Sequence, residues 1–230
     1  MGLIYSKGGK MRLVLLGFPG AGKGTQAKFI AAEYHIPHIS TGDILRSAIQ
    51  KTSELGKKVK NIVADGRLVP DDIMTTLIED RLKQNDCQHG FLLDGFPRTL
   101  QQASALEGIT KIEGVIDIEL SEEAVIERLT GRRIHPASGR TYHLLYQPPR
   151  VQDKDDVTGE PLIQRPDDFE ATIRQRLNVY QIQTSPLKAY YQHAPAICYM
   201  KINGAEPIPQ VKEKIAQALT KLSHAREKID

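Results

Sequence analysis

The chain has 230 residues, enough for one compact domain with small insertions and a sizeable core. Its formal net charge is only +3, which argues against a general nucleic-acid binder, and no apolar run approaches the length of a membrane span. The two cysteines, Cys87 and Cys198, are isolated and stand in unlike contexts. They predict free thiols and a reducing, cytoplasmic location.

Residues 1–10 differ from the rest and are expected to form an N-terminal extension, either native or an expression remnant. Met11 and Arg12 stand directly before the first apolar run and look like a natural start. Residues 1–6 also fit the pattern for N-terminal myristoylation. The apparent start at Met11 makes lipidation the less favoured interpretation.

An apolar run at residues 13–16 predicts a buried strand, and the glycine-rich stretch 17–25, Gly-Phe-Pro-Gly-Ala-Gly-Lys-Gly-Thr, follows it. Apolar residues then recur at helical spacing as far as Tyr34. A strand, a glycine-rich turn and a helix N-terminus in this order form a cradle for phosphate, and Lys23 adds a charge that can reach the terminal phosphates. A turn that merely connects strand to helix is the alternative, but it leaves the lysine unexplained. The stretch therefore predicts a nucleotide phosphate site.

This stretch departs from the usual P-loop pattern at one position. That pattern places Ser or Thr directly after the lysine to bind magnesium, whereas here Gly24 follows Lys23 and Thr25 comes next. Magnesium would then need another ligand or would keep most of its waters. We expect Asp94, at the end of the apolar run 91–93, to hold Mg2+ through water. A helix cap or a surface turn is the alternative role for this aspartate.

Short apolar runs alternate with helical patterns along most of the chain, which predicts an α/β fold with a parallel sheet covered by helices. Five strands are expected, at residues 13–16, 36–40, 91–93, 115–120 and 197–202. Helical spacing lies between and after them, for instance at residues 73–82 and 211–222. Ligands of such folds lie at the carboxyl ends of the strands, so the chemistry is expected in the loops that follow them.

Two segments interrupt the alternation. Residues 41–69 are helical and form a predicted lobe, with Thr41 as the expected N-cap of its first helix. Residues 131–168 are rich in proline and glycine and lack helical periodicity, which predicts a small β-rich lid. The following helix is expected to begin with a capping pair, Asp167 and Glu170. The predicted core domain consists of residues 11–40, 70–130 and 169–230.

Arginines gather at the strand exits and around the predicted lid. They are Arg46, Arg98, Arg128, Arg132, Arg133, Arg140, Arg165, Arg174 and Arg176. Any one of them is most often a surface residue, but guanidinium groups bind phosphates through paired hydrogen bonds, and this array exceeds the needs of one triphosphate. It indicates a second phosphorylated substrate. An acceptor phosphate is largely ionised at neutral pH, so it needs positioning and charge neutralisation rather than a catalytic base.

Four motifs together resemble those of the adenylate kinases. They are Gly17-x-Pro-Gly-x-Gly-Lys-Gly-Thr25, Ser40-Thr-Gly-Asp-x-Leu-Arg46, Gly90-Phe-x-Leu-Asp-Gly-Phe-Pro-Arg98 and Gly131-Arg-Arg133. The similarity runs from residue 11 to the last helix, and the lid is similar to that of the long, bacterial-type members. The resemblance implies a P-loop NTPase-type fold and the reaction ATP + AMP = 2 ADP, in adenine nucleotide homeostasis. It further implies Mg2+ with ATP, and the nucleotides ATP, AMP and ADP as partners. From charge and hydropathy we expect neither nucleic acid nor membrane as a partner, and a monomer is the default expectation because the sequence does not fix the oligomeric state.

The resemblance also assigns the site residue by residue. On the ATP side it implies Gly20, Ala21, Gly22, Lys23, Gly24, Thr25, Arg128, Arg132, Thr141, Tyr142 and, through backbone, Glu206. On the AMP side it implies Thr41, Arg46, Arg67, Leu68, Val69, Gly95, Phe96, Pro97, Arg98, Gln102, Arg165 and Arg176. The implied catalytic residues are Lys23, Arg98, Arg132, Arg165 and Arg176, of which Arg165 and Arg176 would bridge the reacting phosphates.

Two other functions remain open at this level. The first is a kinase for another nucleoside monophosphate, such as UMP or CMP, although the long lid and Gln102 favour AMP by resemblance. The second is a nucleotide-binding regulator without catalysis. Loss of Lys23 or of the arginines would indicate such a regulator, and all of them are present.

Four lid residues take the spacing at which some family members place zinc-binding cysteines. They are His135, Ser138, Asp155 and Thr158. Two hydroxyls cannot replace thiolates in a closed tetrahedral zinc site. We therefore expect no structural zinc and mutual hydrogen bonds among the four side chains.

Overall fold

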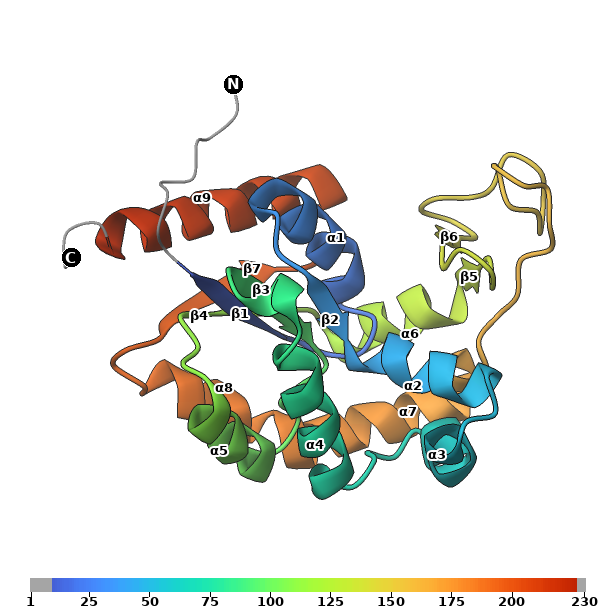
Figure 1. Cartoon of the computed structure of the whole chain (residues 1–230). Helices are drawn as coiled ribbons and strands as arrows, with labels where there is room; N and C mark the ends of the chain where they lie inside the picture. The colour runs from blue at the N-terminus through green and yellow to red at the C-terminus, as the bar shows by residue number, and fades with distance from the viewer. Residues whose placement is uncertain (1–9, 227–230) are drawn as a thin grey trace.

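The computed structural model of the chain describes residues 10–226, and the side chains of residues 10–222. The predicted N-terminal extension lies outside the described residues apart from Lys10, and so does the myristoylation pattern. In the described range, a central sheet of five parallel strands has the order β2-β3-β1-β4-β7, and a separate antiparallel hairpin joins β5 and β6 (Figure 1). The predicted α/β fold of the P-loop NTPase type is confirmed.

The five sheet strands lie within two residues of the predicted bounds. They are β1 (Met11–Leu16), β2 (His38–Ser40), β3 (Gly90–Asp94), β4 (Gly114–Glu119) and β7 (Cys198–Asn203). The central strand β1 pairs with β3 and β4, and the register places Leu15 beside Asp94 and Leu16 beside Asp117. The carboxyl ends of β1, β3 and β4 therefore meet at one edge, where the P-loop begins.

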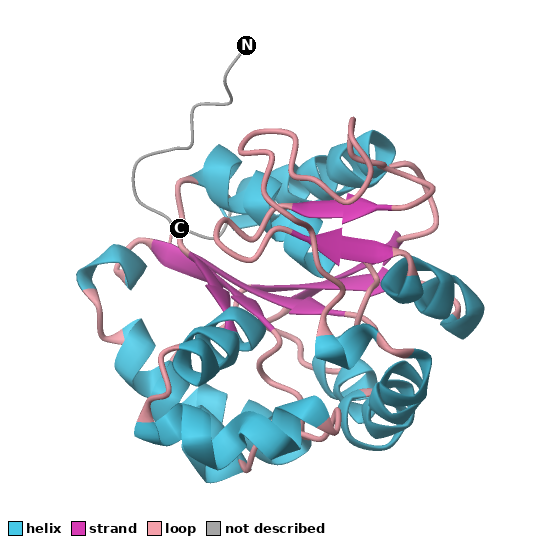
Figure 2. Cartoon of the chain, turned by 90° about the vertical axis from the view of Figure 1, so that its right-hand side faces the viewer, coloured by secondary structure: helices cyan, strands magenta, loops and turns pink. Residues whose placement is uncertain are grey.

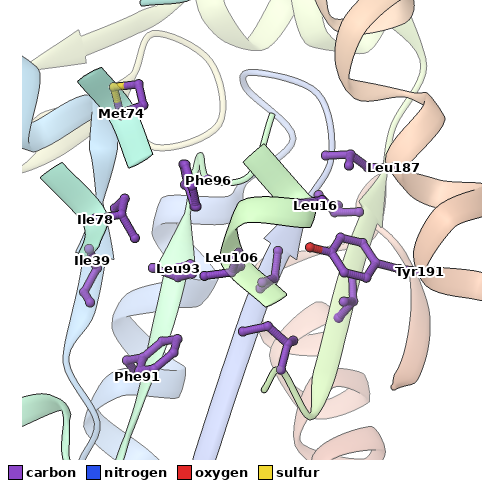
Figure 3. Close-up of a cluster of buried hydrophobic side chains, with 14 of the residues drawn as sticks. Leu16, Ile39, Met74, Ile78, Phe91, Leu93, Phe96, Leu106, Leu187 and Tyr191 are labelled. Carbon is purple, nitrogen blue, oxygen red and sulfur yellow. The ribbon is translucent and has the colours of Figure 1, made fainter. Parts of the chain in front are cut away.

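Alternate residues of the strands face two separate hydrophobic clusters. On one face, α1 (Lys23–Tyr34) and α9 (Ile208–Arg226) cover residues such as Leu13 and Leu15. On the other face, Val14 and Leu16 pack in a cluster with residues from α4 (Asp71–Leu82), α5 (Leu100–Ile109) and α8 (Pro186–Gln192). Figure 3 shows this second cluster, in which Ile78, Phe96, Leu106 and Tyr191 are all nearly inaccessible to solvent. Burial on both faces explains the continuous apolar runs of the sequence.

The predicted lobe of residues 41–69 contains two helices, α2 (Thr41–Gln50) and α3 (Glu54–Ala64), which lie together at one side of the sheet (Figure 1). The expected N-cap was wrong by one residue. Ser40 caps α2, because its hydroxyl accepts a hydrogen bond from the Asp43 N–H. Thr41 is the first helical residue, and its hydroxyl donates instead to the carbonyl of Gly95, at 3.0 Å.

The predicted lid contains the hairpin of β5 (Arg132–Ile134) and β6 (Thr141–His143), with a further bridge between Ile134 and Ile163. It follows α6 (Glu122–Thr130) and ends in the short 3-10 helix η2 (Pro166–Asp168). Figure 1 shows the hairpin and its loops at one side of the central sheet, and Figure 2 looks at the molecule from that side. The prediction of a β-rich segment agrees with this geometry.

A long helical run precedes β7. It consists of α7 (Glu170–Val179), the π-helical turn η3 (Tyr180–Thr184) and α8, which follow one another. The expected capping pair at its start was wrong. Phe169 occupies the N-cap position of α7, and no side chain among the described residues caps the helix there. Asp167 lies in η2, where its carboxylate accepts a hydrogen bond from Arg176.

The remaining short helix, η1 (Asn85–Cys87), precedes β3, and both cysteines are free thiols. No helix within residues 10–226 combines the length and the apolar character that a bilayer crossing requires.

Candidate active site

The P-loop runs from the end of β1 to the start of α1. Gly17 has φ 131°, and a β-carbon there would overlap with the carbonyl of Ile118 on β4, so only glycine fits. Gly22, at φ 99°, precedes α1, whose first turn receives no cap from a side chain in the described chain. The first-turn sequence Lys-Gly-Thr-Gln contains no acidic residue. The N-terminus of α1 is therefore an electropositive cradle suited to an anion.

Lys23 is fixed above this cradle. Its ammonium group donates hydrogen bonds to the carbonyls of Gly17, at 2.7 Å, and Phe18, at 2.8 Å. Burial lowers the pKa of Lys23 to about 8, and the charge of Asp94 opposes this effect. The lysine is thus predominantly charged at neutral pH, and it lies at the helix end that attracts phosphate.

Asp94 ends β3 beside the P-loop. Its carboxylate lies 3.2 Å from the ring nitrogen Nε2 of His38, and 3.8 Å from the place where a β-carbon on Gly24 would stand. Burial by itself would raise the pKa of Asp94, but the hydrogen bond to His38 and the charge of Lys23 outweigh it and hold the pKa below its usual value. A charged carboxylate next to the phosphate cradle fits a magnesium ion that is held through water. The sequence did not predict the His38 contact, which depends on the pairing of β2 with β3.

Arg98 follows β3 and is held by three elements. Its Nε donates to the carbonyl of Gly95 at 2.8 Å, and its backbone N–H donates to the side chain of Gln102 at 2.7 Å. The Thr184 hydroxyl of η3 donates to the Arg98 carbonyl at 2.8 Å. Burial and the charge of Arg176 lower the pKa of Arg98 to about 10. The guanidinium therefore remains charged at neutral pH, on a residue that is only partly exposed.

Arg132 and Arg176 meet at the two aspartates of η2. Arg132 forms a bidentate pair with Asp168, at 2.6 and 2.8 Å, and the Asp168 carboxylate is fully buried. Arg176 donates to the carboxylate of Asp167 at 2.9 Å, and burial lowers its pKa. The aspartates thus fix the arginines of β5 and α7 at one place.

Arg165 lies in the same cluster with an unsatisfied donor. Its Nε is buried and has no hydrogen-bond partner among the described residues. Burial and then the charges of Arg132 and Arg46 lower its pKa to about 10. The pKa of Arg98 is lowered by Arg176 and Arg46, and that of Arg176 by Arg132 and Arg46. The structure therefore brings Arg46, Arg98, Arg132, Arg165 and Arg176 close enough together to influence one another electrostatically.

The other residues implied on the AMP side are more varied. Val69, Phe96 and Pro97 are buried, and Leu68 is half-buried. Arg67 is more than half exposed and pairs with Asp65. Gln102 is buried, with its oxygen bonded to Arg98 and its amide nitrogen bonded to Asp71, at 2.7 Å in each case. Gln102 therefore also supports the loop that carries Arg98.

The residues implied on the ATP side lie in α6, the lid and the loop after β7. Arg128 donates to the carbonyl of Gly204 at 2.9 Å, and Gly204 packs against Ala21 of the P-loop. Glu206 pairs with Lys214, while its second carboxylate oxygen is buried without a partner in the described chain. Thr141 is exposed, and the hydroxyl of the buried Tyr142 donates to Asp155 at 2.9 Å. That hydroxyl thus belongs to the internal network of the lid.

The lid network contains the four residues that the spacing singled out. His135 lies 2.7 Å from the Ser138 hydroxyl, and Thr158 donates to Asp155 at 2.9 Å. The ring of His135 is also within 3.4 Å of Thr158 and 3.9 Å of Asp155. The predicted mutual contacts are therefore confirmed. Arg140, which the sequence placed among the phosphate-binding arginines, forms a bidentate pair with Asp155 instead, and Glu160, which the sequence did not single out, contacts His135.

A P-loop with a charged lysine at the helix start, beside five clustered arginines, defines a phosphotransferase of the P-loop class. The adenylate kinase family model matches residues 15–195. Curated proteins named adenylate kinase from Coxiella burnetii strains Dugway 5J108-111 and RSA 331 / Henzerling II are each 56% identical, over 90% of this chain and 93% of their own length. The chain belongs to the adenylate kinase family. It is a phosphotransferase that moves a phosphoryl group from ATP to AMP, and nothing in the comparisons favours another acceptor.

Proposed function

We propose that the two substrates of this enzyme occupy the two sides of the cluster around Lys23. ATP lies on the P-loop, residues 20–25. Arg128, Arg132 and the loop that carries Glu206 complete its binding site. AMP lies between α2 and the turn after β3. The observation that supports this most strongly is the cluster itself, in which burial and the charges of neighbouring arginines lower the pKa values of Lys23, Arg98, Arg165 and Arg176.

The residues proposed to contact AMP form one continuous set. They are Thr41, Arg46, Arg67, Leu68, Val69, Gly95, Phe96, Pro97, Arg98 and Gln102. Thr41 and Arg98 already share the carbonyl of Gly95 as acceptor, so α2 and the β3 turn are held in one arrangement. Such preorganisation lowers the entropic cost of placing the acceptor phosphate in line for attack.

In the proposed mechanism, fixed cations offset the repulsion between two polyanions. Lys23 exchanges the carbonyls of Gly17 and Phe18 for oxygens of the transferred phosphoryl group, while Arg98, Arg165 and Arg176 face the acceptor phosphate. Asp167 and Asp168 hold Arg176 and Arg132 in place, so little reorganisation is needed as charge moves. The AMP phosphate is largely ionised at neutral pH, so no general base is required.

We propose that Asp94 holds Mg2+ through water. The depressed pKa of this carboxylate, its position beside Gly24 and the lack of a hydroxyl directly after Lys23 support this assignment. A bound magnesium ion would supply further positive charge to the phosphates of ATP. No structural zinc belongs to the proposal. No group of three or more His, Cys, Asp or Glu side chains that could hold a metal occurs in the part of the chain that the structure describes.

We further propose three functional units and a cellular setting. Residues 11–40, 70–130 and 169–230 form the core, residues 41–69 the monophosphate-binding lobe, and residues 131–168 a lid that closes over ATP. The proposed enzyme acts as a monomer on ATP, AMP and ADP, without nucleic acid or membrane. Its free thiols Cys87 and Cys198 suit the reducing cytoplasm.

A coupled assay tests substrate choice. ATP is offered with AMP, UMP or CMP in turn, and ADP formation is followed with and without magnesium. We expect turnover with AMP to exceed turnover with either pyrimidine nucleotide by at least about tenfold, and we expect it to require magnesium. Faster turnover with UMP or CMP would assign the acceptor site to another base.

A further inference from the structure

A buried carboxylate lies directly behind the P-loop. Asp117 of β4 stands opposite Leu16 of β1, the residue that precedes Gly17. Asp117 is fully buried, with an exposed fraction of 0%. Gly17 packs so closely on the neighbouring Ile118 that no β-carbon fits between them. The sheet therefore places a negative charge next to the turn that must accept a polyphosphate.

Two side chains bind this carboxylate from outside the P-loop. The ammonium group of Lys188 on α8 lies 2.9 Å from Oδ2 of Asp117, and the Tyr199 hydroxyl of β7 donates to the same oxygen at 2.7 Å. Lys188 also reaches Glu119, at 3.3 Å. The second oxygen of Asp117 is buried and has no hydrogen-bond partner in the described residues. Lys188 is thus the cation in contact with Asp117.

The position of Lys188 follows from the helical run before it. Arg176, Tyr180, Thr184 and Lys188 recur every four residues, which in an α-helix would rotate each side chain by about 40° relative to the one before. The wider π turn η3, where Ser185 N–H bonds to the Tyr180 carbonyl, offsets this drift. Arg176 therefore contacts η2, the Tyr180 ring packs at a tilt against Phe18 of the P-loop, and Thr184 donates to the Arg98 carbonyl. Lys188 lies on the same run and contacts Asp117.

The charge of Asp117 extends to the groups of the P-loop. Asp117 is one of the charges that act on Lys23, whose pKa it tends to raise against the larger effect of burial. Tyr180 faces Asp117 from η3, and its pKa is raised first by burial and then by this carboxylate. An uncompensated carboxylate at this place would attract Lys23 and repel the phosphates of ATP, and low-dielectric surroundings would strengthen both effects.

We propose that Lys188 is a positioning residue for ATP: it neutralises Asp117 behind the P-loop, so that Lys23 and the backbone cradle present their positive field to the phosphates. This inference rests on the proposed placement of ATP on the P-loop. The alternative is an ion pair that only anchors α8 to the sheet. A positioning role predicts that substitution of Lys188 weakens ATP binding and that substitution of Asp117 tightens it. An anchoring role does not predict opposite changes in ATP affinity for the two substitutions.

The test uses isothermal titration of the full-length protein with ATP and AMP separately, in low salt. Lys188→Met removes the cation and leaves a side chain of similar length. We expect it to weaken ATP binding about tenfold and AMP binding less than about threefold. Asp117→Asn removes the anion instead, and we expect it to tighten ATP binding about twofold to threefold. The double variant should recover ATP affinity to within about threefold of the original protein, and Lys188→Arg should rescue binding.

Lys201→Met is the matched control. Lys201 lies on β7, is more than half exposed, and among the described residues pairs only with Glu119, at 3.9 Å. Its removal therefore changes the net charge by the same amount and leaves the ion pair between Lys188 and Asp117 in place. Thermal melting of each variant separates misfolding from altered binding, and Asp117→Asn and the double variant decide the matter if Lys188→Met does not fold. The inference would be overturned if Lys188→Met lost equal affinity for ATP and AMP, or if Asp117→Asn bound ATP more weakly than the original protein. Failure of the original protein to bind ATP would instead reject the proposed P-loop site.

Discussion

Lys23 shows how burial tunes a single residue of the site. Its ammonium group is held by two carbonyls and by the field of Asp94, yet burial still lowers its pKa to about 8. A lysine poised in this way is charged when it must meet phosphate. It also loses its proton more easily than a surface lysine, so the affinity of the site for ATP must depend on pH.

We predict that ATP binding to the nucleotide-free protein weakens as pH rises through 8. Above this value Lys23 must regain a proton to bind phosphate, so the dissociation constant should rise toward tenfold per pH unit between about pH 8 and 9. The phosphates of ATP are already ionised in this range. Titration at several pH values tests this prediction. Lys23→Met should bind ATP weakly without this pH dependence and should retain its fold while losing most activity.

The same pKa shift affects the stability of the fold in the opposite direction from ATP binding, because stability increases as pH rises. The folded-state pKa of Lys23, about 8, is lower than the ordinary lysine value of 10.5. Between these values the unfolded chain binds the extra proton, so this residue makes the nucleotide-free protein more stable as pH rises. A Lys23→Met variant that kept the steep pH dependence of ATP binding would contradict the assignment to Lys23.

Arg46 offers a second prediction at the scale of one residue. Its guanidinium contacts Asp43 on the surface of α2 and is not needed for core packing. Arg46→Ala should therefore fold normally and weaken AMP binding by about tenfold to a hundredfold, the range for a lost charge-assisted hydrogen bond, with less than about twofold change for ATP. Arg174→Ala is the control, because Arg174 is exposed and, within the described part of the chain, pairs only with Glu170 on the same helix. Equal losses of both nucleotides would count against two separate arginine sets.

At the scale of elements, the strands were predictable and the helix starts were not. Continuous apolar runs such as residues 13–16 can only be buried on both faces, so their place in a parallel sheet follows from the sequence. Ser40 and Thr41 are both good caps, and only the contact of Thr41 with Gly95 decides between them. Asp167 was assigned to a cap because its attraction to Arg176, nine residues later, is not visible in a local pattern.

The site was predictable where a motif fixes the backbone, and unpredictable where distant segments meet. Lys23 and Asp94 follow strand ends, which identifies them from spacing alone. His38 begins the short strand β2 and Asp117 lies inside the apolar strand β4, so the roles of both residues depend on tertiary contacts. The π turn η3 likewise has no sequence signal.

The carboxylate of Asp155 lies at the centre of the hydrogen-bond network within residues 131–168. Asp155 is buried and binds Arg140, Tyr142 and Thr158, and its hydrogen bond to Arg140 above all holds the pKa of Asp155 far below its usual value. Asp155→Asn should loosen residues 131–168, seen as faster hydrogen exchange there with little change in the core. Asp153→Asn is the control, since Asp153 is exposed and its φ of 56° suits asparagine. An undisturbed lid in Asp155→Asn would show that the network is dispensable.

We also predict that the lid binds no zinc. Only His135 and Asp155 of the four spaced residues are good zinc ligands, and both are engaged by neighbouring side chains. Elemental analysis of purified protein should give less than about one zinc per ten chains. Stoichiometric zinc, retained after dialysis against a weak chelator, would refute this.

The whole molecule presents two lobes to one cluster of cations. The lobe of residues 41–69 supplies Arg46, the lid supplies Arg132 and Arg165, and the core supplies Lys23, Arg98 and Arg176. In the absence of nucleotide, burial and the charges of neighbouring arginines lower the pKa values of Arg98 and Arg165. Bound phosphates would remove this repulsion. Each lobe should therefore be drawn toward the core by its own nucleotide, and both lobes together only when both nucleotides are bound. Closure of both would exclude water from the reacting groups.

A dinucleotide analogue, two adenosines joined through five phosphates, tests this expectation because it mimics ATP and AMP together. We predict that it slows hydrogen exchange in residues 41–69 and 131–168 at once. ATP alone should protect mainly the P-loop and the lid, and AMP alone mainly residues 41–69. The control is Lys188→Arg, which keeps every charge of the cluster and should respond to the analogue as the original protein does. Unchanged exchange in residues 131–168 with the analogue bound would mean that this segment is no lid and that Arg132 and Arg165 act without closure.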